Sequence, residues 1–281
     1  MTKSRWAVRG RVFFVLFILW GMLVAGNGMN AVGRPDMKLG KFLELGLSVA
    51  DLAEAKTFYE RLGFLPAKTI GTEHPSAAYT DGNIVLTLHQ REFPSPGLFY
   101  FAADLAPWRA KLTAAGIAFE EGTSADGRYA ELSFRDPEGF CVFLTTRKSL
   151  KREDVAFEPL DPARVPDERR HFSALGMFGE LALATRDRLA RAEFWKGLGF
   201  EARHESESPY PWGIYSDGMA VLGFHQTPEF EGAKLTFFSK DSARRIEDLK
   251  ARGILFTQEM EGGNALLTAP DGTAFFLFNL P

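Results

Sequence analysis

The sequence contains a single cysteine, Cys141, among 281 residues. One thiol cannot form an internal disulfide, and it cannot supply a Cys-rich zinc site or a redox pair. The sequence also has no motif for a serine or cysteine nucleophile, no phosphate-cradling glycine loop and no dinucleotide fingerprint. These absences exclude disulfide scaffolds and thiol redox enzymes, whereas oxidising and reducing compartments are both compatible with the chain.

The chain also lacks an excess of positive charge. Its net charge is -3, and because residues 1–36 carry +4, the remainder carries about -7. A nucleic-acid-binding surface neutralises phosphates with clustered Lys and Arg. The composition is otherwise that of a globular protein, 46% hydrophobic and 25% charged, and the length allows two medium domains. We therefore expect no nucleic acid partner.

Long uncharged apolar runs are scarce, and the clearest extends from Val12 to Ala25 after four positive charges in residues 1–11. Basic, hydrophobic and then small residues are typical of a secretory signal, and the run is short for a membrane-spanning helix, which needs about 20 residues. Residues 1–36 are therefore predicted to be a signal peptide or an N-terminal membrane anchor. The protein would then be exported or anchored, with membrane contact only through this segment. If translation begins at Met37 instead, the protein is cytoplasmic.

The main feature of the chain is an internal repeat with a constant offset of 136 positions. The segment from Glu44 to Gln90 and the segment from Glu180 to Gln226 share their landmarks without a gap. The landmarks are a Glu in the first strand, an Asp before the helix, a Leu-Gly-Phe helix end, an Asp-Gly turn and a terminal His-Gln. So many matches at one offset indicate a duplicated module.

Each module has the pattern of two β-α-β-β-β units. In the first, alternating apolar residues predict a strand at 42–49, followed by a helix at 52–62 that Asp51 caps and Gly63 ends. A second helix is expected at 105–115, after which Ile117 to Phe119 and, in module 2, Ile254 to Phe256 are expected as strands. The predicted domains are module 1 at 37–148, a polar linker with three prolines at 149–175, and module 2 at 176–281.

The alternation of strand residues places acidic and histidine side chains on one face of each module. Glu44 and His89 have this position in module 1, and Glu180 and His225 match them in module 2. Their neighbours on this face are mostly small, namely Gly46, Ser48, Thr87, Ala182, Ala184 and Gly223. The remaining lining is expected to be aromatic, from Tyr100, Phe143, Phe237 and Phe276. An aromatic hollow with few polar groups is typical of a small-molecule site, and burial there would raise the pKa of Glu44.

The helix end that begins at Phe58 (Phe-Tyr-x-x-Leu-Gly-Phe) and the turn that begins at Asp136 (Asp-Pro-Glu-Gly-Phe) resemble the vicinal oxygen chelate (VOC) superfamily. That superfamily contains glyoxalase I, extradiol dioxygenases, fosfomycin-resistance enzymes and bleomycin-binding proteins. The resemblance implies an α+β fold of tandem glyoxalase-like (VOC) modules, with four βαβββ units forming two cupped mixed sheets. It implies no single activity, because function in such folds depends on the site.

The resemblance also implies a divalent metal held at four strand positions. The first position is Glu44 or Glu180, and a carboxylate can bind such an ion. The other positions hold apolar residues, which we assign as Val85, Leu98 and Phe143 in module 1 and Val221, Leu235 and Phe276 in module 2. A divalent ion needs about three protein ligands, so no metal or other cofactor is expected. Sharing between modules, for instance Glu44 with His225, is the alternative that would keep a metal.

The main hypothesis is a glyoxalase/bleomycin-resistance-like protein that binds a small molecule without a complete metal site. Its candidate ligand-binding residues, to which no catalytic role is assigned, are Glu44, His89, Tyr100, Glu180, Trp212 and His225. Trp212 is included because Pro211 and Gly213 predict a loop that folds over the second hollow.

Two alternatives to this hypothesis stay open. One is a divergent metal-dependent lyase or extradiol-type dioxygenase. The other is a structural or partner-binding module whose hollows are packed shut by Phe143 and Phe276. In a purely structural interpretation, Glu44 and Glu180 pair with an Arg or accept from backbone N–H groups. The sequence predicts no oligomeric state.

Overall fold

The structure is a computed structural model that describes residues 37–67, 74–124, 127–147 and 173–280. The leader predicted at residues 1–36 and most of the predicted linker lie outside the described residues, so the signal peptide or anchor stays a prediction. Within the described ranges, no helix combines the length and the apolarity that crossing a bilayer requires.

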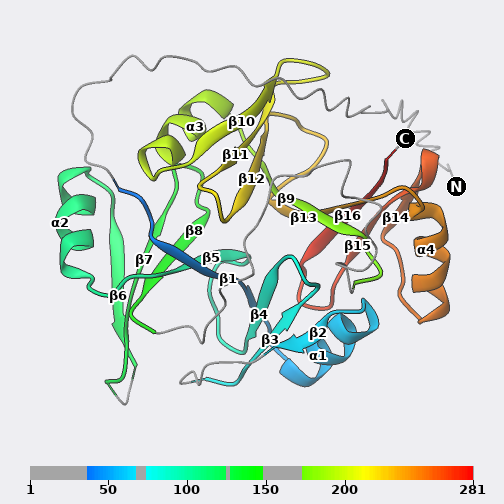
Figure 1. The fold of residues 1–281 in the computed structure, drawn as a ribbon, viewed down its shortest axis with the longest axis horizontal. Helices are drawn as coiled ribbons and strands as arrows, with labels where there is room; N and C mark the ends of the chain where they lie inside the picture. Colours follow the sequence, from blue (N-terminus) through cyan, green and yellow to red (C-terminus); the bar gives the residue numbers. More distant parts are fainter. Residues whose placement is uncertain (1–36, 68–73, 125–126, 148–172, 281) are drawn as a thin grey trace, which may run out of the picture.

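Module 1 is one eight-stranded mixed sheet with the strand order β2-β3-β4-β1-β5-β8-β7-β6 (Figure 1). The first strands of its two units, β1 and β5, pair antiparallel at the centre, whereas β1–β4 and β5–β8 are parallel pairs. Its elements are β1 (Lys41–Ser48), α1 (Leu52–Arg61), β2 (Leu65–Ala67), β3 (Ser76–Thr80), β4 (Val85–His89), β5 (Gly97–Phe101), α2 (Ala106–Ala114), β6 (Phe119–Thr123), β7 (Ala130–Arg135) and β8 (Cys141–Thr145).

Module 2 repeats this topology as a second eight-stranded sheet, β10-β11-β12-β9-β13-β16-β15-β14. Its elements are β9 (Met177–Ala184), α3 (Arg188–Gly197), β10 (Glu201–Ser206), β11 (Trp212–Ser216), β12 (Val221–His225), β13 (Ala233–Ser239), α4 (Ser242–Ala251), β14 (Gln258–Met260), the short 3-10 helix η2 (Glu261–Gly263), β15 (Asn264–Thr268) and β16 (Ala274–Asn279). The identical order confirms the predicted α+β fold with four βαβββ units in two mixed sheets.

Local signals in the sequence explain how the first helix of each module begins. The Asp51 carboxylate accepts from the N–H groups of Ala53 and Glu54, and Asp187 accepts from Ala190 at the same place in α3. A side-chain cap of this kind satisfies donors that the helix itself leaves unpaired.

Two strands begin later than predicted, and the reason is the same in both modules. After the second helix of each module, the N–H of Ile117 donates to Leu112 O at 2.9 Å, and the N–H of Ile254 donates to Leu249 O at 3.0 Å. These residues therefore complete the helix end rather than start a strand. Pairing begins only at Phe119 and Gln258.

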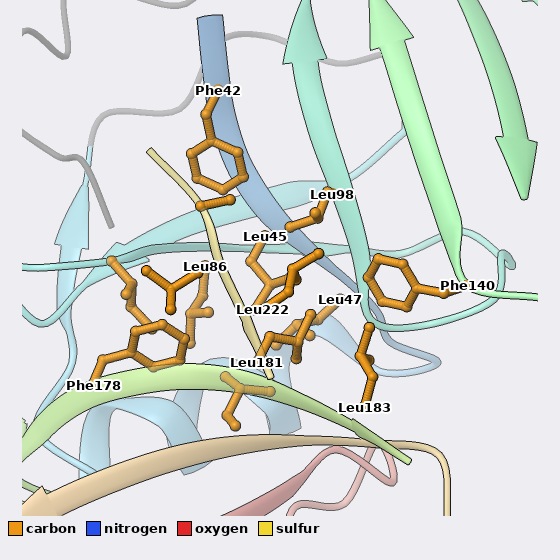
Figure 2. Packing of buried hydrophobic residues seen from close by; sticks show 14 of the residues in the cluster. Phe42, Leu45, Leu47, Leu86, Leu98, Phe140, Phe178, Leu181, Leu183 and Leu222 are labelled. Carbon is orange, nitrogen blue, oxygen red and sulfur yellow. The ribbon is translucent and has the colours of Figure 1, made fainter. Parts of the chain in front are cut away.

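The two modules share one hydrophobic core. Leu45 and Leu47 of β1 belong to the same buried cluster as Leu181 and Leu183 of β9, and Figure 2 shows these side chains packed together between the sheets. Each is at most 2% exposed, and burying a leucine side chain contributes about 1.5–3 kcal/mol. The hydrophobic faces of the central strands therefore fix one module against the other.

Polar contacts related by the duplication add to this interface. The Asp136 turn of module 1 reaches α3, where Asp136 Oδ2 accepts from Trp195 Nε1 at 3.1 Å and from Arg191 Nε at 2.7 Å. The Asp271 turn of module 2 reaches α1, where Asp271 Oδ2 accepts from the Tyr59 hydroxyl at 3.0 Å. In Figure 1, α3 accordingly lies beside β8 and α1 lies below β15 and β16. The Asp136 turn thus helps to hold the modules together.

A third interface contact is present on one side only. The hydroxyl of Tyr100 on β5 donates to Asp217 Oδ2 in module 2 at 2.8 Å. The register places Phe237, which has no hydroxyl, at the matching position of β13, and the counterpart of Asp217 is Asp81. Asp81 Oδ2 is buried and has no hydrogen-bond partner within the described part of the chain. Burial raises the pKa of Asp81 to about 6, although backbone N–H groups of Ile84 and Asn83 oppose the shift.

Candidate functional site

All the candidate residues except Tyr100 lie on the face of each sheet that points away from the shared core. A shift in register between Phe42 and Glu44 interrupts the pairing of β1 with β5. Leu43 therefore packs with Phe99 on the same side as Glu44, and not with Leu45 in the core as simple alternation predicts. A β-bulge inserts one extra residue and turns two consecutive side chains to one face.

In module 1 the Glu44 carboxylate is fully engaged by neighbouring side chains. Its Oε2 accepts from the Thr87 hydroxyl at 2.7 Å, and its Oε1 contacts His89 Nε2 at 3.1 Å. Arg147, which follows β8, places its guanidinium on the same Oε1. Glu44 is 6% and Arg147 is 7% exposed, so this is a buried ion pair. A buried carboxylate is tolerated only with such compensation.

The surroundings of Glu44 reverse the effect of burial on its pKa. Burial alone would raise that pKa, but the charge of Arg147 and the hydrogen bonds from His89 and Thr87 together hold it well below its usual range. The expectation of a raised pKa is therefore wrong, and Arg147 is the main physical reason. Glu44 is a permanent carboxylate and not a general base poised near neutral pH.

A chain of hydrogen bonds leads from Glu44 towards the rim of module 1. Because an ionised carboxylate only accepts, His89 Nε2–H is the donor to Glu44. His74 Nε2 lies 2.9 Å from the other ring nitrogen, His89 Nδ1, so one hydrogen joins the two rings. Burial, and next the neighbouring His89, lowers the pKa of His74 to about 4. The His74 ring is therefore neutral at pH 7.

Aromatic rings close the rest of the module 1 hollow. Phe99 stacks on His89 with 5.2 Å between ring centroids and on Phe143 with 4.3 Å. Arg91 lies 5.3 to 5.7 Å from the centroids of three rings in this group and forms a two-point ion pair with Glu131 at 3.0 and 3.2 Å. Phe143 therefore packs this hollow shut, as the structural alternative expects for module 1.

A cleft of about 690 Å³ lies beyond these rings. Phe93 and Phe143 form part of its wall, and Glu120, Glu131 and Cys141 also line it. Burial raises the pKa of the Cys141 thiol, which makes it a poor nucleophile. Neither Glu44 nor His89 is among the described residues that line this cleft, so it does not reach the Glu44 carboxylate.

The module 2 centre retains only part of this arrangement. Glu180 Oε1 contacts His225 Nε2 at 3.0 Å, and the Tyr210 hydroxyl lies 3.3 Å from His225 Nδ1. Glu180 and His225 are each 4% exposed. Tyr210 stands at the offset position of His74, so a donor–histidine–carboxylate series recurs in both modules.

Two buried oxygen atoms distinguish the module 2 centre. Glu180 Oε2 and Thr236 Oγ1 have no hydrogen-bond partner among the described residues. The register sets Thr236 directly opposite Glu180, as Phe99 is opposite Glu44, so the two side chains are neighbours on one face. The counterpart of Thr87 is Gly223, where a Cβ atom would overlap Glu180 Oε2. Module 2 therefore lacks the hydroxyl that Thr87 donates to Glu44 in module 1. The Glu180 carboxylate occupies the space where a side chain at position 223 would lie.

Aromatic side chains surround this second centre. Trp212 lies parallel to the His225 ring at 6.0 Å, and Phe230 contacts the same ring at 5.7 Å. Phe230 also contacts Phe276 at 5.6 Å. Trp212 is buried and begins β11. The prediction that it lies on a loop is therefore wrong, but it does contact the His225 ring.

Two of the aromatic residues expected in the hollows face the other way. Tyr100 and Phe237 belong to the shared core between the modules. Leu98 and Leu235, assigned to the family's fifth-strand metal position, also lie in that core, and the residues opposite Glu44 and Glu180 are Phe99 and Thr236. The predicted register of these strands was therefore wrong by one residue, and Tyr100 does not line the hollow. The sequence pattern failed on β5 because both faces of that strand are apolar, whereas on β13 Lys234 and Thr236 alternate with apolar residues and this signal was not used.

The residues present do not fit a divalent metal with three protein ligands. In module 1 the Arg147 guanidinium holds the carboxylate that would bind the ion. In module 2 Glu180 and His225 already bond each other, and the remaining family positions hold Thr236 and Phe276. No group of three or more His, Cys, Asp or Glu side chains within the described ranges could hold a metal. Sharing of Glu44 with His225 does not occur, because each pairs within its own module.

The comparisons with known proteins agree with this fold. Residues 41–142 match the family model described as the Glyoxalase/Bleomycin resistance protein/Dioxygenase superfamily. No curated protein matches the sequence at a significant level.

Among solved structures, the chain is similar to a variant of homoprotocatechuate 2,3-dioxygenase from Brevibacterium fuscum, with a TM-score of 0.56 and 13% identity, covering 88% of this chain and 74% of that one. It is also similar to BphC, a halotolerant catechol dioxygenase (TM-score 0.52, 17% identity, 85% and 86% covered). A third similar structure is the 2,3-dioxygenase LapB from Pseudomonas sp. KL28 (TM-score 0.52, 16% identity, 86% and 94% covered). At such identities the likeness shows the fold and not the activity.

The family match over module 1 and the repetition of the same fold in module 2 agree with the resemblance stated from the sequence. Residues 41–142 match the Glyoxalase/Bleomycin resistance protein/Dioxygenase superfamily model, and module 2 repeats the strand order of module 1, so the chain has the tandem fold that the resemblance implies.

Proposed function

We propose that the protein binds a small molecule at the module 2 centre, without a metal, and that the matching centre in module 1 is a closed structural counterpart. The observation that supports this proposal most is the buried Glu180 Oε2 atom, which has no partner in the described part of the chain. Its equivalent on Glu44 accepts from Thr87, beside the ion pair with Arg147. In this proposal the matching carboxylates have different roles. Glu44 is part of a structural ion pair, and Glu180 is available to a ligand.

The energetic argument starts from the cost of such an atom. Leaving a buried acceptor unsatisfied costs about 1–3 kcal/mol, and more when the group is charged. A ligand that donates to Glu180 and Thr236 recovers that cost on binding. His225 holds the carboxylate in place through Oε1, so Oε2 is positioned before a ligand arrives. Preorganisation of this kind improves affinity because less ordering is needed at binding.

The surrounding rings supply the apolar part of the site. Trp212 and Phe230 contact the ring of His225, and Phe276 pairs with Thr236, so the centre combines aromatic surface with a few polar groups. This is the usual composition of a small-molecule site. A metal-dependent dioxygenase or lyase activity stays an alternative hypothesis, and it requires ligands beyond Glu180 and His225.

The experiment compares small aromatic probes of one shape, namely toluene, benzyl alcohol, benzoate and benzylamine, by ligand-observed NMR with the purified full chain. We expect at least one of them to bind. Thr236→Phe, which introduces at module 2 the ring that Phe99 supplies at module 1, should abolish binding. Thr87→Val in module 1 is the matched control and should leave binding unchanged.

Three results would contradict this proposal. The first is the absence of binding by every probe, and the second is binding that Thr236→Phe does not affect while circular dichroism shows an intact fold. The third is a stoichiometric divalent ion that remains bound after dialysis of the purified protein, since that would overturn the metal-free part. Metal analysis by mass spectrometry of the dialysed protein gives this third readout.

A further inference from the structure

We propose that the ligand of module 2 is an organic cation with N–H donors, such as a protonated amine, an amidine or a guanidine. Its head group would donate to Glu180 Oε2 and would supply the positive charge that the Arg147 guanidinium supplies to Glu44 through Oε1. This inference rests on the proposed function and adds the chemical class of the ligand. Module 1 thus contains, in its own Arg147, an internal analogue of the ligand head group.

The strand registers establish which residue of module 2 corresponds to Arg147. Phe99 pairs with Phe143 in module 1, and Thr236 pairs with Phe276 in module 2. Arg147 lies four positions after Phe143, and the residue four positions after Phe276 is Leu280. Leu280 is buried in an apolar cluster with Met177 and Phe238. Module 2 therefore has the carboxylate but a leucine at the position of Arg147.

Glu180 Oε2 and Thr236 Oγ1, the two orphan atoms, have no hydrogen-bond partner among the described residues, and they determine the chemistry of the head group. A carboxylate only accepts hydrogen bonds, so Glu180 Oε2 requires a donor, and a hydroxyl such as that of Thr236 can accept a second N–H from the same group. A cationic donor makes shorter and stronger hydrogen bonds to a carboxylate than a neutral one. An anionic ligand would face an unscreened negative charge in a buried site. The chemistry therefore favours a cation over a neutral alcohol and excludes an acid.

The rings favour the same class of ligand and indicate its size. Phe230 already has the Lys234 ammonium 5.8 Å from its ring centroid, within the distance at which a ring attracts a cation. Thr236 is smaller than Phe99 and the registers place the two residues identically, so the ligand ring would take the place that the Phe99 ring has in module 1. Benzamidine has a ring of this size and a planar head with N–H donors. Tyr210 and Phe230 are half-buried where they cover His225, so they would have to move aside on entry.

The test is isothermal titration of the full-length protein with three shape-matched probes, benzamidine, benzyl alcohol and benzoate. We expect one benzamidine per chain, weaker binding of benzyl alcohol and no binding of benzoate. Glu180→Gln should weaken benzamidine at least about tenfold, as expected for a lost hydrogen bond to a charged group. Thr87→Val in module 1 should bind as the unmodified protein does.

A second variant keeps the test informative if Glu180→Gln misfolds. Thr236→Val removes only the orphan hydroxyl and keeps the size of the side chain, and it should weaken benzamidine while leaving the circular dichroism spectrum unchanged. If benzyl alcohol or benzoate binds as tightly as benzamidine, or if neither variant alters benzamidine binding, the cation assignment is wrong. The proposed function then survives if any probe binds in a way that Thr236→Phe abolishes. If no probe binds at all, both proposals are wrong.

Discussion

The two carboxylates Glu44 and Glu180 occupy matching positions in one duplicated fold, yet their surroundings differ. Glu44 has three side-chain partners, one of them the cation Arg147. Glu180 has one, His225, and its second oxygen is buried without a partner in the described ranges. The backbone positions are shared, so the difference comes from a few side chains.

Three substitutions account for the divergence. Each pair consists of a module 1 residue and its module 2 counterpart: Thr87 and Gly223, Phe99 and Thr236, Arg147 and Leu280. Together they remove a hydroxyl donor, a covering ring and a cation from the second centre. A duplicated fold can therefore use one copy of a site for stability and leave the other available for a ligand, because the sheets themselves need neither centre to pair.

The largest expected effect is that of Arg147→Leu, which leaves Glu44 charged, buried and without its cation. Breaking a buried pair in this way typically costs 3–5 kcal/mol. We expect the free energy of unfolding to fall by about 3–5 kcal/mol at pH 7, measured by urea denaturation. Adding Glu44→Gln to the variant should restore most of the loss, since no charge is then left alone. A loss below about 1 kcal/mol would show that the pair is solvated.

The pH dependence of stability gives a second readout of the same contact. The pKa of folded Glu44 lies below its ordinary value of 4.5, so its contribution is fully present above that value and is lost as the pH falls below it. Arg147→Leu should therefore lose less stability between pH 5 and pH 3 than the unmodified protein. An unchanged slope of stability against pH would contradict the assignment of the pKa shift to Arg147.

A smaller difference is expected between the two turns at the module interface. Asp136→Ala leaves Arg191, which is 3% exposed, without its carboxylate, and should cost about 2–4 kcal/mol. Asp271→Ala removes the hydrogen bonds from the Tyr59 hydroxyl and the Thr273 N–H but leaves no buried charge behind, and it should cost about 1–2 kcal/mol. Urea denaturation of the two variants side by side tests the ranking. Equal losses would mean that the existing bond from Arg191 Nη1 to Ala184 O is enough to satisfy the guanidinium.

The one-sided contact of Tyr100 with Asp217 predicts effects of opposite sign. Tyr100→Phe removes the hydroxyl that donates to Asp217 Oδ2 and should destabilise the protein by about 1–2 kcal/mol. Phe237→Tyr should place a hydroxyl near Asp81 and stabilise the protein by a similar amount at pH 7. Urea denaturation of both variants measures the two changes.

Asp81 also supplies a pH test of the Phe237→Tyr variant. Because its pKa is raised from 3.8 to about 6, the folded state binds the extra proton, and stability falls as the pH rises from about 4 to about 6. A hydroxyl introduced at position 237 that donates to the carboxylate should lower this pKa and reduce the fall. Thermal unfolding across that pH range measures it, and an unchanged profile would mean that the new side chain does not reach Asp81.

The smallest effect is expected for Glu180→Gln. The amide oxygen can still accept from His225, and no cation is left behind, so we expect a change below about 1 kcal/mol. The matched variant Glu44→Gln should cost more, because Arg147 then becomes a buried charge without its carboxylate. Similar losses for both variants would argue against the functional difference between the centres.

Much of the fold could be predicted from patterns that act locally. Asp51 and Gly63 mark the first helix, and the constant offset identifies the repeat. Alternation along two strands also brought Glu44 and His89 to one face, where they lie 3.1 Å apart. The structural interpretation that a buried Glu pairs with an Arg is confirmed for Glu44, whereas Glu180 has no Arg partner among the described residues.

The rest of the site depended on information that is not local. Arg147 is 103 positions from Glu44 and lies beyond the last predicted strand of its module, so no spacing rule connects them. Phe99 was missed because β5 is apolar on both faces and offers no alternation to read. Thr236 was missed although Lys234 and Thr236 alternate with apolar residues on β13. His74 and Tyr210 share the repeat offset, and this signal was present in the sequence but not used.

Residue order alone determined the duplication, the helix caps and the type of sheet, since these follow from contacts between near neighbours and from alternating polarity. Tertiary packing decided which carboxylate acquires a cation and which keeps an oxygen without a partner. The physical reason is that a buried charge is stabilised or destabilised by whichever side chains converge on it in space. Arg147 reaches Glu44 only after β8 has been laid beside β5, and at Glu180 the corresponding strand is followed by a leucine.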